Sequence, residues 1–150
     1  YVEMVLMYVR LDSKSTDYVI SRCSLDGIIC RALRRFSGEF IQKRLSLSYE
    51  PVETEAITDE KWLGFVIEQV LSNALKYIDK GGITVTLEPD MTLCIRDTGM
   101  GIAPEDLPRI FQKGYTGYNG RGDKRSSGIG LYLCRRVCDN LSHSIRAESK

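Results

Sequence analysis

The chain has 150 residues, of which 43% are hydrophobic and 27% charged, the composition of an ordinary globular domain rather than of a disordered or fibrous chain. Its 21 lysines and arginines nearly balance 20 aspartates and glutamates, which excludes nucleic-acid binding through bulk positive charge and leaves only a local basic patch. No apolar run reaches the ~18 residues that cross a bilayer. We expect one domain with a short attached segment.

The first third of the chain is read from its hydrophobic periodicity. Residues 1–10 are expected to be the end of a helix, and residues 11–23 a polar linker. Apolar residues recur at helical spacing over residues 24–43, where Ser24 is the expected N-cap. Apolar and polar residues then alternate over residues 45–50, which predicts a half-buried strand.

The middle of the chain predicts a helix followed by a hairpin. Residues 50–60 are expected to be a connection with a short strand. A helix is expected from Thr58, its N-cap, to Ile78, and Gly81-Gly82 should stop it. The strands expected next, over residues 83–88 and 91–96, join as a hairpin at Pro89-Asp90.

The last third begins with a glycine-rich stretch over residues 97–130. A third helix is expected from Gly128 to Leu141, and a last strand from Ser144 to Glu148. Together the elements predict an α/β (α+β) two-layer sandwich, in which three helices cover a mixed, largely antiparallel sheet.

Five cysteines without a CxxC pair favour a reducing compartment over a disulfide framework. Cys134 and Cys138 are four residues apart on the third helix, a spacing that two metal ligands could use. They share a stripe with Leu133, Val137 and Leu141, and free cysteine behaves as a small buried hydrophobe. We therefore expect them in the core.

Polar residues gather on one side of the second helix. Gln69, Asn73 and Lys76 lie at i, i+4 and i+7. They are opposite an apolar stripe formed by Leu63, Ile67, Leu71, Ala74 and Ile78. A solvated face is the simple interpretation, but Trp62 and Phe65 lie on the same side. Two amide oxygens above a lysine suit Mg²⁺ and a phosphate, because Mg²⁺ takes oxygen ligands and shares them with phosphates.

Two glycine motifs follow. Asp97-Thr-Gly-Met-Gly101 comes directly after a strand, where glycine lets the backbone approach a flat ligand and the carboxylate can accept from an amine such as adenine N6. The motif Ser126-Ser-Gly-Ile-Gly-Leu131 opens the third helix, whose N-terminus favours an anion. A plain turn and an ordinary helix start are the alternatives. The glycine-rich, basic segment between the motifs is a candidate lid.

The order and spacing of these elements resemble the ATP-binding family shared by histidine kinases, the gyrase B subunit, the MutL repair protein and a heat-shock chaperone. The second helix corresponds to the N box, DTGMG to the G1 box, IFQKG to the F box and SGIGL to the G2 box. The resemblance covers residues 24–150. Within the family, EQVLSNALKY, RIFQKGYTGYNGR and SSGIGLYLCRRV are most similar to intramembrane-sensing histidine kinases paired with bacitracin-type peptide transporters.

The resemblance implies ATP and Mg²⁺ as cofactors and assigns residues to them. Gln69 and Asn73 are the implied metal ligands. The implied nucleotide contacts are Asn73, Lys76, Tyr77, Asp97, Gly99, Gly101, Ile102, Lys113, Gly114, Tyr115, Ser127, Gly128, Ile129, Gly130 and Leu131. No catalytic residue of the chain itself is implied.

Two departures from the family pattern matter. Many histidine kinases have Asn where this chain has Gln69, and the ATPases of the family have Glu there to activate water. Gln69 cannot accept that proton, which favours phosphotransfer over hydrolysis. The only histidine is His143, followed by Ser144 rather than by the acid that usually follows a phosphoacceptor.

We therefore expect residues 1–23 to be the end of a dimerisation helix with its linker, and residues 24–150 the ATP-binding catalytic domain without its last strand. The expected activity is that of a protein histidine kinase, with little turnover by this chain alone. The resemblance implies three partners: the protein's own dimerisation and phosphoacceptor domain, a response regulator and, as a candidate, a peptide-type ABC transporter. It implies no nucleic acid, and a cytoplasmic domain of a bacterial membrane protein. The alternatives are a serine-kinase or ATPase member of the fold family and a nucleotide-free interaction module.

Overall fold

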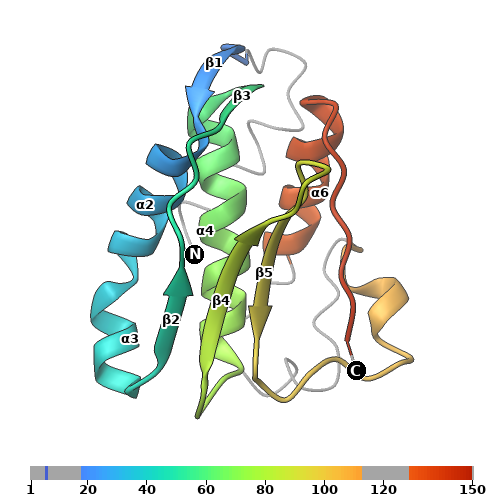
Figure 1. Ribbon diagram of the computed structural model, residues 1–150. Coiled ribbons are helices and arrows are strands. Elements are labelled where there is room, and N and C mark those ends of the chain that lie inside the picture. The colour runs from blue at the N-terminus through green and yellow to red at the C-terminus, as the bar shows by residue number, and fades with distance from the viewer. Residues whose placement is uncertain (1–5, 7–17, 113–128, 150) are drawn as a thin grey trace. The chain divides into compact units, whose positions relative to one another are not determined.

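The computed structural model (Figure 1) describes residues 6, 18–112 and 129–149. The chain divides into two compact units. The larger unit is Ile20–Gly101, and the smaller comprises Tyr1–Val19 and Ile102–Lys150. Of the helix expected over residues 1–10, only Leu6 is described, and it is helical and exposed.

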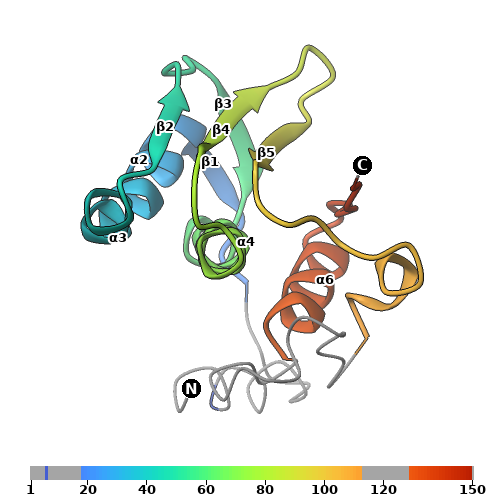
Figure 2. The ribbon, with the colours of Figure 1, turned by 90° about the horizontal axis from the view of Figure 1, so that it is seen from below.

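The larger unit has two layers. Its main sheet has the strand order β2-β4-β5, in which β2 and β4 are parallel while β4 and β5 are antiparallel. The helices of this unit, α2, α3 and α4, lie on one face of this sheet (Figure 2). A second, antiparallel sheet pairs β1 with β3. The elements are β1 (Ser21–Ser24), α2 (Leu25–Arg35), α3 (Ser37–Lys43), β2 (Ser46–Tyr49), β3 (Glu55–Thr58), α4 (Glu60–Lys76), β4 (Gly82–Leu87) and β5 (Leu93–Asp97). This arrangement confirms the expected mixed α+β class.

The core of the larger unit lies between the helices and the main sheet. Ile28 and Ile29 of α2, Leu71 and Leu75 of α4, and Ile83 of β4 are at most 2% exposed. The stripe predicted for the second helix is confirmed, because its residues either are buried or pack against this core. Burial of one helical face therefore holds α4 against the sheet.

The helix expected over residues 24–43 is interrupted, so that prediction is corrected. Ser24 caps α2 as expected, accepting from the Gly27 N–H at 3.2 Å. The helix ends at Arg35, and Phe36 leaves the helical region with φ −103° and ψ 7°. The Ser37 hydroxyl donates to the Arg34 carbonyl at 2.9 Å, and such local bonds compete with helix continuation. A second helix, α3, begins at Ser37.

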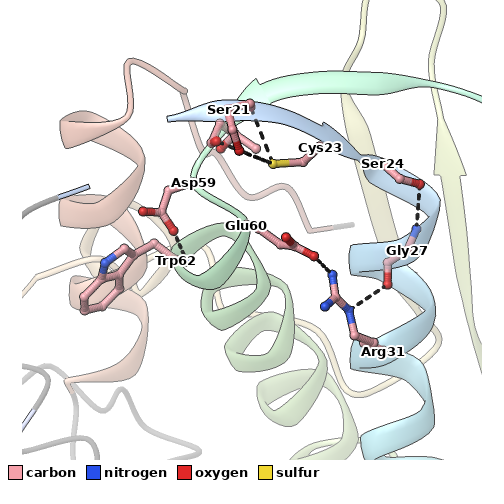
Figure 3. A network of polar contacts seen from close by, with 9 residues as sticks. Ser21, Cys23, Ser24, Gly27, Arg31, Asp59, Glu60 and Trp62 are labelled. Atoms are coloured by element: carbon pink, nitrogen blue, oxygen red, sulfur yellow. Dashed lines mark hydrogen bonds and ion pairs between the residues drawn. The ribbon is translucent and has the colours of Figure 1, made fainter. Parts of the chain in front are cut away.

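The second helix, α4, is confirmed, but its cap is Asp59 rather than Thr58. The Asp59 carboxylate accepts from the Trp62 N–H at 2.9 Å and is 4% exposed (Figure 3). Thr58 is instead the last residue of β3. Figure 3 also shows Arg31 of α2 paired with Glu60 in the first turn of α4, so the start of α4 is fixed both from within and from α2.

The strands differ from expectation mainly at the edges of the sheets. β2 forms within residues 45–50, but its Leu47 is 41% exposed, because β2 is an edge strand. The short strand expected in residues 50–60 is β3, and its partner β1 falls in the stretch expected to be a linker. The hairpin of β4 and β5 is confirmed, with the Glu88 N–H donating to the Thr92 carbonyl at 2.8 Å.

The described part of the smaller unit contains a short 3-10 helix, Leu107–Arg109, and helix α6, Gly130–Asn140. Helix α6 confirms the third predicted helix. The strand expected from Ser144 to Glu148 is wrong, because residues 141–149 join no described sheet. Near the end of this segment, the Ser149 hydroxyl accepts from the Ile102 N–H at 2.9 Å, a side-chain bond rather than a ladder bond. Among the described helices, none is both long and apolar enough to span a membrane.

Candidate functional site

The polar side of α4 carries three half-buried residues: Gln69, Asn73 and Lys76. The amides of Gln69 and Asn73 make no hydrogen bond with a described residue, so their oxygens are available to a ligand. The Lys76 ammonium lies 5.6 Å from the centre of the Tyr77 ring. Trp62 and Phe65, on the same side, are buried and pack edge to face with ring centres 6.0 Å apart. This side of α4 is therefore not a plain solvated face.

The end of α4 contacts the loop that follows β5. The Tyr77 carbonyl accepts from the Met100 N–H at 3.4 Å. Asp97 Oδ1 accepts from the Gly99 N–H at 2.8 Å. A Cβ at residue 99 would lie 2.8 Å from the Tyr77 oxygen, a distance that Cβ atoms do not adopt. Glycine is required at residue 99 because the loop backbone lies directly against the helix end.

The same loop is fastened to the start of β4 through Thr98. The Thr98 hydroxyl donates to the Lys80 carbonyl at 3.1 Å and accepts from the Gly82 N–H at 3.0 Å. The Thr98 N–H donates to the Gly82 carbonyl at 3.2 Å. Gly81 has φ +100°, and a Cβ there would collide with the Thr98 hydroxyl. Sequence reasoning missed this role of Gly81 and Thr98, although paired glycines before a strand were a signal of close backbone contact.

Asp97 is exposed at the end of β5. Its Oδ1 is engaged by Gly99, whereas Oδ2 has no partner among the described residues. The turn therefore fixes the carboxyl group while leaving one oxygen to accept a hydrogen bond from a ligand. Gly101, with φ +78°, ends this loop in a conformation that favours glycine.

The other expected site residues belong to the smaller unit. Gly130 is the first residue of α6, and Ile129 before it makes no side-chain capping bond. Leu131 lies in the first turn of α6, and Ile102 bonds Ser149 as described above. Lys113, Gly114, Tyr115, Ser127 and Gly128 lie outside the described residues. In the F-box motif, the Phe111 ring lies 5.4 Å from the Arg135 guanidinium of α6.

The thiols of α6 are core residues, as predicted. Cys134 and Cys138 are buried. Burial raises the pKa of Cys134 and raises that of Cys138 to about 11. Protonated thiols are poor metal ligands, and the described residues contain no cluster of three or more His, Cys, Asp or Glu side chains that could bind a metal.

Comparison with known families shows to which protein family the chain belongs. The model of the histidine kinase-, DNA gyrase B- and HSP90-like ATPase family matches residues 58–150. The chain belongs to this family. The matched range contains α4, the Asp97–Gly101 loop and α6. The family expectation drawn from the sequence motifs is therefore confirmed.

Curated relatives that match at more than 30% identity include sensor histidine kinases. The chain is 35% identical to sensor histidine kinase YxdK of Bacillus subtilis (strain 168), across 99% of this chain and 47% of the relative. It is 37% identical to sensor histidine kinase GraS of Staphylococcus haemolyticus (strain JCSC1435), across 96% of this chain and 43% of the relative. The chain thus spans less than half the length of these relatives.

Solved structures support the fold. The full-length ShkA structure, a complex with AMPPNP, superposes with a TM-score of 0.74 at 19% identity. The match covers 99% of this chain and 33% of ShkA.

The residues of the larger unit fit ATP and Mg²⁺ by their chemistry. Gln69 and Asn73 offer uncharged oxygens that no described residue engages, the kind of ligand that Mg²⁺ accepts alongside phosphate oxygens. Lys76 adds a positive charge one turn further along α4. Asp97 offers an acceptor held in place by the Gly99 N–H, in a loop that lies directly against the end of α4.

Proposed function

We propose that this chain is the ATP-binding catalytic domain of a two-component sensor histidine kinase. In this proposal it positions ATP and Mg²⁺ for phosphoryl transfer to a histidine on a separate dimerisation domain. The observation that carries the proposal is the contact between the last turn of α4 and the Asp97–Gly101 loop. This contact fixes the position of the Asp97 carboxylate, the proposed acceptor for the adenine amine, relative to the lysine and the two amides on the polar side of α4.

Five residues of the larger unit have a proposed role in binding ATP and Mg²⁺. Asp97 accepts a hydrogen bond from the adenine amine, and Tyr77 borders the nucleotide. Lys76 neutralises phosphate charge, while Asn73 and Gln69 donate oxygen ligands to Mg²⁺. The metal supplies further neutralisation of the transferred group. Positioning and charge neutralisation are the main demands of phosphoryl transfer.

Residues of the smaller unit enter the proposal from family resemblance. We propose that backbone N–H groups at the start of α6 bind phosphate oxygens, as helix N-termini favour anions. The proposed contacts beyond the larger unit are Ile102, Lys113, Gly114, Tyr115, Ser127, Gly128, Ile129, Gly130 and Leu131.

Phosphoryl transfer is favoured over ATP hydrolysis because residues 68 and 69 of α4 offer no free carboxylate to activate water. Gln69 cannot act as a general base for water. The neighbouring Glu68 is engaged elsewhere, because its Oε2 lies 3.1 Å from Nη1 of Arg35 on α2. Neither residue supplies a free carboxylate on the polar side of α4.

The partners are proposed for the whole protein. We propose a homodimer formed through the protein's own phosphoacceptor domain, and a response regulator as the next acceptor. A peptide-type ABC transporter is a further proposed partner. Of the expected segment 1–23, Ser21–Cys23 belong to β1, so the proposed end of the dimerisation helix with its linker is the part before β1. The chain is the proposed cytoplasmic portion of a membrane protein.

Calorimetric titration with the non-hydrolysable analogue AMPPNP, with and without Mg²⁺, tests this function. Micromolar binding that Mg²⁺ strengthens is expected. An absence of binding would instead favour a nucleotide-free interaction module. Rapid phosphate release from ATP by the chain alone would favour a hydrolytic member of the family.

A further inference from the structure

We propose that Lys43, which lies outside all the family motifs, is a positioning residue for the nucleotide site. In this proposal its ammonium group fixes the last turn of α4, and that turn in turn fixes the Asp97–Gly101 loop. The inference rests on the proposed function, because it assigns Lys43 to the support of the same site.

The contact itself is between a cation and the end of a helix. Lys43 Nζ donates to the Leu75 carbonyl at 2.6 Å and to the Ile78 carbonyl at 3.3 Å. Helix α4 ends at Lys76 and Tyr77 is its C-cap, so the Leu75 carbonyl belongs to the last turn, which lacks intrahelical donors, and the Ile78 carbonyl lies just beyond the cap. The negative end of the helix dipole also favours a cation at this place. Lys43 therefore acts as a C-terminal cap supplied from another helix.

The end of α3 explains why Lys43 reaches α4. Lys43 is the last residue of α3, and Arg44 after it adopts a left-handed conformation with φ +56°. The Leu45 N–H then donates to the Phe40 carbonyl at 2.9 Å. Phe40 and Leu45 are both buried in the core, so this helix end is anchored. The anchored turn gives the Lys43 side chain a fixed starting point.

The capped turn is the one that contacts the proposed adenine loop. Between the two carbonyls bound by Lys43 lies that of Tyr77, which accepts from the Met100 N–H. Lys76, the proposed phosphate ligand, belongs to the same turn. Two supports thus act on one turn: the ammonium of Lys43 and the loop backbone. Without Lys43, we expect the turn to loosen and the Tyr77–Met100 bond to open more often.

The test compares nucleotide affinity in matched variants. Lys43→Met removes the ammonium but keeps the stem. Because Lys43 is an exposed residue, the loss should weaken binding of Mg²⁺–AMPPNP by about 2- to 5-fold, the range expected when an exposed helix-end cation is removed. Lys43→Arg keeps a donor and should recover most of the affinity. Arg44→Met removes the neighbouring charge without touching the carbonyls, and should bind like the parent chain.

A second readout separates positioning from general destabilisation. Tyr49→Phe removes the bond from the Tyr49 hydroxyl to Asp26, which joins β2 to α2 away from the end of α4. It should lower stability without weakening nucleotide binding. Exchange of the Met100 amide hydrogen should accelerate in Lys43→Met and not in Tyr49→Phe or Arg44→Met.

The outcomes distinguish this inference from the function beneath it. If the parent chain binds Mg²⁺–AMPPNP and Lys43→Met binds equally well, the role of Lys43 is overturned while the function stands. Equal losses in Lys43→Met and Tyr49→Phe would also overturn it. If the parent chain itself does not bind, the proposed function and the role of Lys43 in it both fail.

Discussion

Gly99 lies so close to Tyr77 that a methyl group on residue 99 would be 2.8 Å from the Tyr77 carbonyl oxygen. That oxygen already accepts from the Met100 N–H, so it cannot simply move away. Asp97 Oδ1 lies at the same 2.8 Å from the hypothetical methyl. One substitution would therefore press on both the helix end and the proposed adenine acceptor.

Gly99→Ala should weaken binding of Mg²⁺–AMPPNP by at least about tenfold, because relief of the clash displaces Asp97 or the end of α4. Gly38→Ala is the matched control. A Cβ at Gly38 meets nothing within 4 Å in helix α3, so it should raise the free energy of unfolding by about 0.5–1 kcal/mol. Titration and denaturant unfolding measure both. Full affinity in Gly99→Ala would contradict the tight approach.

Asp97→Asn should reduce affinity for Mg²⁺–AMPPNP by about 10- to 150-fold, since a hydrogen bond to a charged group contributes about 1.5–3 kcal/mol. The asparagine oxygen can still accept from the Gly99 N–H, so the turn should persist. Calorimetry measures the affinity, and amide exchange at Gly99 checks the turn. Unchanged affinity would remove Asp97 from the site.

Gln69→Met should diminish the strengthening of AMPPNP binding by Mg²⁺ and leave binding without Mg²⁺ nearly unchanged. The substitution keeps the length of the side chain and removes its oxygen, which is the proposed metal ligand. Ser72→Ala, an exposed neighbour on α4, serves as the control and should retain the full Mg²⁺ effect. Equal Mg²⁺ dependence in Gln69→Met and the parent would exclude Gln69 as a ligand.

Asp59→Ala should lower the free energy of unfolding by about 0.5–2 kcal/mol, the usual cost of an N-cap. The buried carboxylate is the acceptor for the Trp62 N–H at the start of α4. Asp59→Asn keeps an acceptor and should recover most of the loss in urea unfolding. A stable alanine variant would show that the pairing of α4 with Arg31 is sufficient.

The free energy of unfolding should fall as the pH rises from about 9 to 11. Burial, aided by Asp139, raises the pKa of Cys138 from 9.0 to about 11, so the folded chain keeps a proton that the unfolded chain loses. Cys138→Ala should reduce this slope without abolishing it, because burial also raises the pKa of Cys134. Urea unfolding at several alkaline pH values gives the slope. An identical slope in the variant would contradict the assignment.

The fold was predictable where one local pattern dominates. Helix α4 followed from its apolar stripe, and the β4–β5 hairpin from two alternating runs around Pro89. The break at Phe36 was not predictable, because apolar residues keep helical spacing from α2 into α3. Strand β1 was missed since it has a single buried residue, Cys23, and is defined by its distant partner β3.

At residues 144–148, by contrast, a local strand pattern is present but no strand forms. Ile145 and Ala147 are less exposed than their neighbours, so alternation is real, yet no described strand pairs with the segment. A strand requires a partner, which a local pattern cannot supply.

In the candidate site too, residues in local motifs were predicted, whereas residues that act through distant contacts were not. Asp97 and Gly99 were found because their motif is local in sequence. The role of Thr98 in holding the loop against the start of β4 was not predicted, and Lys43 lay outside every motif. The Thr98 hydroxyl accepts from the Gly82 N–H, 16 positions away in the sequence, and Lys43 donates to carbonyls at least 32 positions away. Only the folded backbone brings these partners within reach.

The larger unit is one uninterrupted stretch, Ile20–Gly101, whereas the smaller unit is made from the segments on either side of it. The Asn140 amide donates to the Tyr18 hydroxyl at 2.8 Å across these two segments. During synthesis from the N-terminus, the larger unit can complete its core before the ribosome has made α6. The smaller unit must wait for residues more than a hundred positions downstream of Tyr18. A stalled or truncated nascent chain that ends near residue 101 would therefore carry the adenine acceptor of the proposed site but not helix α6.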